Sequence, residues 1–229
     1  MIGLKNYESI IGFMILMVVY LISIAPAGCF RAWVAKKMGD DTAEELGFLT
    51  LNPFVHMDFF GVMVLFLFSD TIRIPFNGRS EPMYTGFGWG KHVLVNPLNI
   101  HGRYRWPKLA AALFADSFVH FCLPVLALIV LKLVMISAGP ATSLTPAMLL
   151  ALQFHRAFVN LNVWLLVVEG IVNAVMLGLF YHGRNASLYE AFQISYVALF
   201  APLVIIFLFG GQLSVWISQA ITFVGNLIL

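Results

Sequence analysis

The segment LGFLTLNPFVHMDFFGV, residues 46–62, is the most informative stretch of this sequence. The pair Asn52-Pro53 is a turn signal, and His56 and Asp58 follow it directly before an apolar run. That run, FFGVMVLFLF at residues 59–68, would form a helix of about 15 Å, half the thickness of a bilayer core. We therefore predict that residues 59–68 enter a membrane and turn back as a re-entrant segment.

The chain as a whole is strongly apolar. Of its 229 residues, 61% are hydrophobic and 10% are charged, which is far from the composition of a soluble domain. We predict an all-α integral membrane protein, a polytopic bundle of about five transmembrane helices in a single domain over residues 1–229. The runs long enough to cross a bilayer are residues 10–27, 109–136, 161–181, 187–209 and 210–229; whether the last run spans the membrane or lies on it stays open.

The interval 71–107 is polar and interrupted by Gly and Pro. Its segment HVLV, residues 92–95, has a β-like pattern between turn signals, so we predict a short β-hairpin at the membrane surface. With 59–68 re-entrant, ten basic residues share one side and Lys5, Lys132 and Arg156 lie opposite. The positive-inside rule then places the N-terminus outside and residues 30–108 on the cytoplasmic-equivalent side. A net charge of +2 predicts no nucleic-acid partner.

Three motifs, taken in order, resemble the site-2 protease family of intramembrane zinc metalloproteases, in particular its small bacterial branch without a PDZ domain. Residues 36–61 resemble the family's Gly-Asp pair, Thr-Leu-Asn-Pro turn and His-x-Asp-x-x-Gly element. Residues 87–100 resemble its Phe-Gly-Trp-x-Lys-Pro-Val-x-Val-Asn-Pro hairpin, and residues 189–209 its closing helices. The resemblance implies the family's membrane fold, and a location in the bacterial inner membrane or in an organelle membrane of bacterial descent.

The family's catalytic motif is missing. In the family, a His-Glu-x-x-His helix supplies two zinc ligands and a general base, and a later Asp completes the site. The first motif would fall on residues 27–31, where Ala27 has no donor atom, Gly28 has no carboxylate, and Arg31 cannot lose its proton to bind a cation. The later Asp would fall on Tyr181. We predict no catalytic residue, no metal and no cofactor.

The family's middle-helix motif Ala-Gly-Pro-x-x-Asn falls on residues 115–120, so that Asp116, Ser117 and His120 replace Gly, Pro and Asn. Asp116 and His120 are four residues apart and share a helix face. Charged groups inside a membrane span need a partner. We predict that an ion pair of Arg31 with Asp116, supported by His120, fills the former zinc site.

Other interpretations stay open at this point. The rival to the ion pair is a rebuilt metal site, with candidate ligands drawn from Cys29, His56, Asp116, His120 and His182. His56 and Asp58 are metal or proton-handling groups, or they tie the Asn52-Pro53 turn and the re-entrant segment by hydrogen bonds to backbone groups. Glu169 is a proton relay, a lipid headgroup contact or a contact to a partner subunit.

The loss of every catalytic group predicts a pseudoprotease that keeps the family's membrane fold. Its expected role is that of a binding or structural subunit of a membrane complex, with membrane lipids and other transmembrane subunits as partners. By resemblance, the partner would lie among the runs 10–27, 161–181 and 187–209. The alternatives are an intramembrane metalloprotease with a relocated metal site and a small proton or ion pathway.

Overall fold

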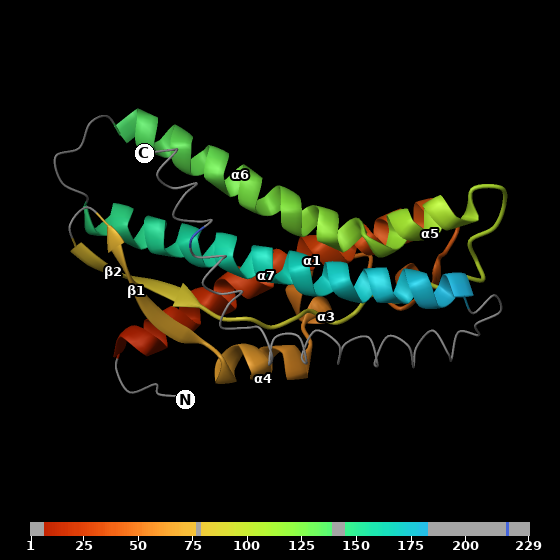
Figure 1. Ribbon diagram of the computed structural model, residues 1–229, viewed down its shortest axis with the longest axis horizontal. Coiled ribbons are helices and arrows are strands. Elements are labelled where there is room, and N and C mark those ends of the chain that lie inside the picture. Colours follow the sequence, from red (N-terminus) through yellow and green to blue (C-terminus); the bar gives the residue numbers. More distant parts are fainter. Residues whose placement is uncertain (1–6, 77–78, 139–144, 183–218, 220–229) are drawn as a thin grey trace.

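Three long helices dominate the computed structural model, which describes residues 7–76, 79–138, 145–182 and 219. They are α1 (Tyr7–Met38), α6 (Ala115–Ala138) and α7 (Pro146–His182). Each is long and apolar enough to cross a membrane. Figure 1 shows α7 between α6 and the β-hairpin, with α1 crossing behind it. The described chain is thus mostly helical and consistent with a membrane protein.

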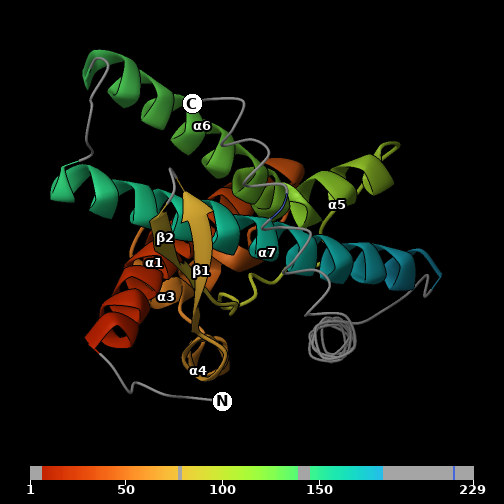
Figure 2. The ribbon, with the colours of Figure 1, turned by 60° about the vertical axis from the view of Figure 1, so that its left-hand side comes forward.

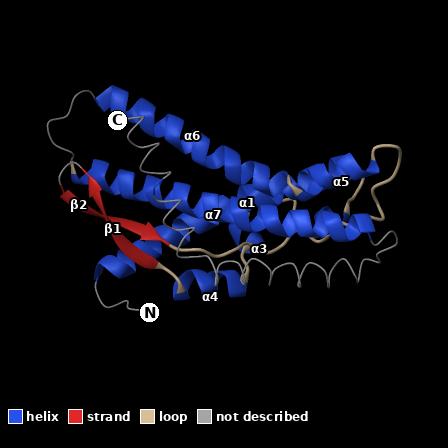
Figure 3. Cartoon of the chain, viewed as in Figure 1, coloured by secondary structure: helices blue, strands red, loops and turns tan. Residues whose placement is uncertain are grey.

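Shorter elements join the long helices. They are α2 (Thr42–Glu45), α3 (Pro53–His56), α4 (Phe59–Leu67), β1 (Asp70–Phe76), β2 (Arg79–Thr85) and α5 (Arg105–Leu113). The first four lie between α1 and the hairpin turn, and α5 leads directly into α6 (Figure 3). In the turned view of Figure 2 the hairpin stands in front of α7, and β2 packs against that helix.

The bounds of the long helices differ from those predicted. Helix α1 continues beyond Ala27 to Met38, and α7 begins at Pro146 rather than at residue 161. Polar side chains in both extensions hid them from a search for apolar runs, although Arg31 and Arg156 are in fact buried. The predicted run 109–136 is two helices that meet at Phe114, a break between apolar residues that hydropathy does not detect. The predicted spans 187–209 and 210–229 lie outside the described residues.

Side chains cap the two short helices of the 46–62 segment. Asn52 Oδ1 accepts a hydrogen bond of 3.1 Å from Phe54 N at the start of α3, and Pro53 occupies the first turn. Asp58 Oδ1 accepts a hydrogen bond of 2.7 Å from Gly61 N at the start of α4. These caps satisfy backbone N–H groups that a helix start leaves unpaired. Helix α4 has the short length expected of a re-entrant segment, and its membrane insertion stays a prediction.

The interval 71–107 contains an antiparallel strand pair, but not where the HVLV pattern placed it. Strands β1 and β2 pair from Asp70 opposite Thr85 to Phe76 opposite Arg79. The prediction that residues 92–95 form a strand is wrong, because they pair with no other described segment and belong to no strand. Val93 and Val95 alternate inward to the core, and this burial produces the two-residue period of a strand.

The segment that follows the hairpin is tied to the 46–62 segment. Tyr20 on α1 donates a hydrogen bond of 2.9 Å to the Trp89 carbonyl, and Lys91 N donates one of 2.6 Å to the His56 carbonyl. Gly61 on α4 lies against the Trp89 backbone, so closely that a Cβ there would overlap the Trp89 carbonyl oxygen. The 46–62 segment and the segment around Trp89 thereby pack together beside α1, although they are far apart in sequence.

We expect Gly61→Ala to destabilise the protein by about 1–3 kcal/mol, because an added methyl group would force the α4 and Trp89 backbones apart. The matched control is Gly170→Ala, at a helical position where a Cβ would meet no atom within 4 Å. Thermal unfolding in detergent measures both. A Gly61→Ala protein as stable as the control would contradict this packing.

Candidate functional site

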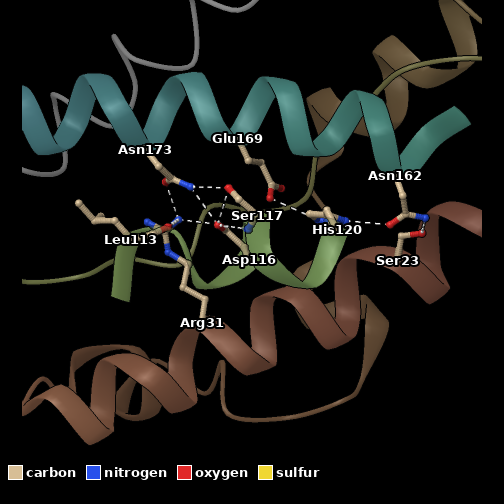
Figure 4. A network of polar contacts seen from close by, with 9 residues as sticks. All are labelled: Ser23, Arg31, Leu113, Asp116, Ser117, His120, Asn162, Glu169 and Asn173. Atoms are coloured by element: carbon tan, nitrogen blue, oxygen red, sulfur yellow. Dashed lines mark hydrogen bonds and ion pairs between the residues drawn. The ribbon is translucent and has the colours of Figure 1, made fainter. Parts of the chain in front are cut away.

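A buried polar network lies where α1, α6 and α7 meet (Figure 4). It contains Ser23 and Arg31 from α1, the Leu113 carbonyl from α5, Asp116, Ser117 and His120 from α6, and Asn162, Glu169 and Asn173 from α7. Polar groups in such an apolar setting are costly unless they pair with one another. The network includes every residue of the predicted Arg31, Asp116 and His120 cluster, but in two adjacent groups.

Arg31 is the centre of the first group. Its side chain has 0% exposure. Atom Nη1 lies 2.5 Å from Asp116 Oδ2, 2.8 Å from Asn173 Oδ1 and 3.0 Å from the Leu113 carbonyl oxygen. A buried guanidinium requires this kind of charge-assisted pairing with several acceptors.

The antiparallel contact of α6 with α7 positions the acidic partner. Asn173 Nδ2 donates hydrogen bonds to Asp116 Oδ1 at 2.9 Å and to Ser117 Oγ at 3.2 Å. Ser117 N donates to the same Asp116 oxygen at 2.6 Å. Both carboxylate oxygens of Asp116 are therefore occupied, which fixes the carboxylate toward Arg31. Asn173 thus serves as a bridge between Arg31 and Asp116.

His92 completes the first group, and sequence reasoning missed it. Its Nε2 lies 3.0 Å from Arg31 Nη2, so this ring nitrogen accepts the hydrogen bond and the imidazole is neutral. Burial and the neighbouring Arg31 guanidinium lower the pKa of His92 to about 3. The available signal was a departure from the family's hairpin motif, because His92 stands where that motif has Pro.

His120 belongs to the second group rather than to Arg31. Its Nδ1 lies 2.9 Å from Asn162 Oδ1, and its Nε2 lies 3.2 Å from Glu169 Oε2 without the alignment of a hydrogen bond. Asn162 Nδ2 donates to Ser23 Oγ at 2.8 Å. The predicted support of Arg31 by His120 is thus replaced by support from Asn173 and His92. Asp116 and His120 do share one face of α6, but they contact different residues of α7. Asp116 contacts Asn173, whereas His120 contacts Glu169 and Asn162.

Glu169 points inward in the described structure (Figure 4). Its carboxylate faces His120 of the same chain, and only 17% of its side chain is exposed. This placement does not suit a lipid headgroup contact or a contact to a partner subunit. It favours an internal pairing of Glu169 on α7 with His120 on α6. Glu169 lies one helical turn before Asn173.

His56 fills the space beside Gly28. The ring has 1% exposure, and Nε2–H donates to the Thr50 carbonyl oxygen at 2.8 Å. Nδ1 faces Gly28 so closely that a Cβ at residue 28 would overlap it. Burial lowers the pKa of His56 and favours the neutral ring. A glutamate at position 28 therefore has no room while His56 keeps this place.

A small cavity remains at this point, lined among others by Gly28, His56, His92, Asp116 and Glu169. Its volume is about 30 Å³. That is enough for about one water molecule, whereas a pocket for an organic ligand usually has roughly 300–1,000 Å³.

The residues present do not fit the family's zinc. Ala27 and Gly28 offer no ligand, and the Arg31 guanidinium lies where the second histidine would be. Tyr181, at the position of the later aspartate, is 59% exposed and contacts the Trp106 ring at the far end of α7. No group of three or more His, Cys, Asp or Glu side chains able to hold a metal occurs among the described residues.

The ligands suggested for a rebuilt metal site are not brought together. His182 is exposed at the end of α7, and its Nδ1 lies 3.0 Å from the Gly178 carbonyl oxygen. His120 is enclosed between α6 and α7, and His56 is held by Thr50. Cys29 stays a free thiol on α1. The rebuilt site thus lacks a shared centre in the described part of the chain.

Comparison with known proteins gives one relative of this chain. It is 32% identical over 98 residues to the "Putative zinc metalloprotease YwhC" of Bacillus subtilis (strain 168). The similarity supports a relationship to the site-2 protease family. The aligned part covers 43% of this chain and 35% of the relative, so the chain spans only about a third of that protein. No family model matches the chain, and no solved structure matches it.

We expect Asp116→Asn to destabilise the protein by about 3–5 kcal/mol, because it leaves the buried Arg31 guanidinium without a negative partner. Replacing both partners, as in Arg31→Met with Asp116→Leu, should recover most of this loss, since no charge is then buried alone. The control is Lys36→Ala, which breaks the exposed pair with Glu44 and should cost no more than about 1 kcal/mol. Thermal unfolding in detergent tests all three. An Asp116→Asn protein as stable as Lys36→Ala would contradict the proposed role of the pair.

His92 should make the protein unstable to acid. Its pKa of about 3 in the folded chain lies below the usual value of about 6.5 for an unfolded chain. The unfolded chain therefore takes up the proton first, and stability falls as the pH drops from about 6.5 towards 3. We expect a smaller loss of melting temperature between pH 7 and pH 4 in His92→Gln, whose amide oxygen still accepts from Arg31. The exposed His101 provides the control, His101→Gln. Equal pH slopes in the two variants would refute the neutral state of the half-buried His92.

Proposed function

We propose that this chain is a catalytically inactive, site-2-protease-like membrane protein that acts as a binding or structural subunit of a membrane complex. The observation that carries the proposal is the Arg31 guanidinium, a permanent positive charge held by Asp116, Asn173, His92 and the Leu113 carbonyl. By the sequence resemblance, residue 31 is the position at which the family has its second zinc-binding histidine. A fixed cation there opposes the binding of another cation by charge and by volume.

The chemistry of peptide hydrolysis gives further support. Such a reaction needs an activated water molecule, a general base and space for the scissile carbonyl. Position 28 has no carboxylate, and His56 fills the volume beside it. The remaining cavity of about 30 Å³ has room for about one water molecule and none for a peptide.

What persists is a set of apolar helices suited to packing against other helices. Helix α6 contacts α1 and α7 over its first turns, and Figure 1 shows it diverging from α7 toward its C-terminal end. Large apolar side chains on this diverging part are exposed, among them Leu126, Ile129 and Leu133. Transmembrane helices associate through close packing of such surfaces. We therefore propose that the partner subunit packs against α6. This surface is additional to the runs 10–27, 161–181 and 187–209, which the family resemblance suggested.

The orientation predicted from the sequence remains part of the proposal. Arg31 and Arg156 are buried within α1 and α7 and do not count as loop charges, but the other basic residues keep the same asymmetry. The N-terminus is then outside, and the segment from the end of α1 to α5 lies on the cytoplasmic-equivalent side. The resemblance to the site-2 protease family is also the basis for proposing a bacterial inner membrane, or an organelle membrane of bacterial descent, as the location.

The proton pathway has less support. The row His120, Asn162 and Ser23 ends where Ser23 Oγ donates to the Val19 carbonyl within α1. A relay needs a continuing chain of exchangeable groups, and this end of the row returns to the helix backbone.

Native mass spectrometry of the protein, extracted gently from its own membrane, tests the proposal in one spectrum. We expect a chain without zinc in a defined complex with another membrane protein. A parallel sample treated with a chelator controls for loosely bound metal. A lone chain carrying one chelator-resistant zinc would overturn the proposal and support the relocated metal site. A lone chain without metal would refute the subunit role alone.

A further inference from the structure

We propose that the chain has a binding site for an anionic phospholipid, with one acyl chain in an apolar groove between α5 and α7 and the phosphate held by basic residues at the groove's end. The groove is lined chiefly by Trp106, Ala110 and Phe114 on α5 and by Ala174, Gly178 and Tyr181 on α7. We call it the α5–α7 groove. It lies apart from the Arg31 network and does not depend on the proposed loss of catalysis.

Small residues between large ones form the groove. Ala110, Ala174 and Gly178 leave its floor low, while the aromatic side chains of α5 and Tyr181 form its walls. An added Cβ at Gly178 would meet no atom within 4 Å, so that position opens directly onto free space. The cavity has about 560 Å³ and is lined almost entirely by apolar atoms. It is far larger than the cavity of about 30 Å³ beside His56.

The groove is short and uneven. The α5 wall from Trp106 to Phe114 is about 12 Å long at 1.5 Å per residue. A single extended acyl chain is thin and flexible enough to follow such a wall along its length.

The end of the groove has the character of a membrane interface. The Trp106 and Tyr181 rings meet there with their centroids 5.0 Å apart, one from the start of α5 and one from the end of α7. Trp and Tyr are enriched at the level of lipid headgroups. The apolar depth of the groove toward Phe114 and Ala174 then lies on the hydrocarbon side.

Charge complementarity identifies the headgroup as anionic. Arg103 and Arg105 lie at the start of α5, directly before Trp106 in the sequence. Residues 98–114 contain no Asp or Glu, and neither do residues 170–182. The Arg105 guanidinium lies 5.3 Å from the Trp106 ring centroid and donates to the Pro97 carbonyl, which holds it beside the groove. Basic clusters of this kind next to transmembrane helices attract anionic lipids.

The test is native mass spectrometry of the full chain with equal amounts of dioleoyl phosphatidylglycerol and dioleoyl phosphatidylcholine. We expect the wild type to retain phosphatidylglycerol at least fivefold over phosphatidylcholine. Gly178→Leu places a side chain in the groove and should lower the retention of both lipids at least fivefold. Gly170→Leu is the matched control, because this open glycine of the same helix lies outside the groove.

A second pair of variants separates the headgroup from the acyl chain. Arg103→Gln with Arg105→Gln should reduce phosphatidylglycerol to the level of phosphatidylcholine, whereas Lys36→Gln with Lys37→Gln at the end of α1 should not. Equal loss in Gly178→Leu and Gly170→Leu would mean non-specific lipid around the helices and would overturn the proposal. Retention unchanged by Gly178→Leu would also overturn it and leave the groove to a helix of this chain or of a second copy.

Discussion

A buried positive charge at Arg31 is the constraint on which the rest of the site depends. In an apolar helical bundle this guanidinium must be surrounded by acceptors, and each comes from a different segment: Asp116 from α6, Asn173 from α7, His92 from the segment after the hairpin, and the Leu113 carbonyl from the end of α5. Removing one acceptor leaves a charge that the bilayer interior cannot solvate. The pair therefore fixes how the helices meet.

The same geometry explains why the changes at the site come together. A fixed cation at Arg31 is compatible with an aspartate at position 116, and the smallest residue at position 28 leaves room for the His56 ring. Each substitution fits its neighbours, and the family's ligands would each disturb one of them. The described site is held together by internal charge pairing, at positions where the motif of the family that the sequence resembles would have metal ligands.

Different parts of this chain were predictable to different degrees. Apolar runs located the three long helices, and the charge of Arg31 with the spacing of Asp116 and His120 pointed to a buried pair. The helix ends, the break at Phe114 and the strand positions were not predictable, because hydropathy registers composition and not hydrogen bonding. His92 and Asn173 were missed since a single histidine and a single asparagine carry no periodic signal. The one available signal was that His92 departs from the Pro of the family's hairpin motif.

The sequence by itself determined the apolar character of the chain and the absence of a His-Glu-x-x-His motif in any register, because both are properties of residue order. The tertiary structure alone decided which polar groups became partners. Asp116 and His120 lie on one helix face, yet the antiparallel course of α7 gives Asn173 to the first and Glu169 and Asn162 to the second. Such choices depend on contacts between residues far apart in sequence, and a local pattern does not encode them.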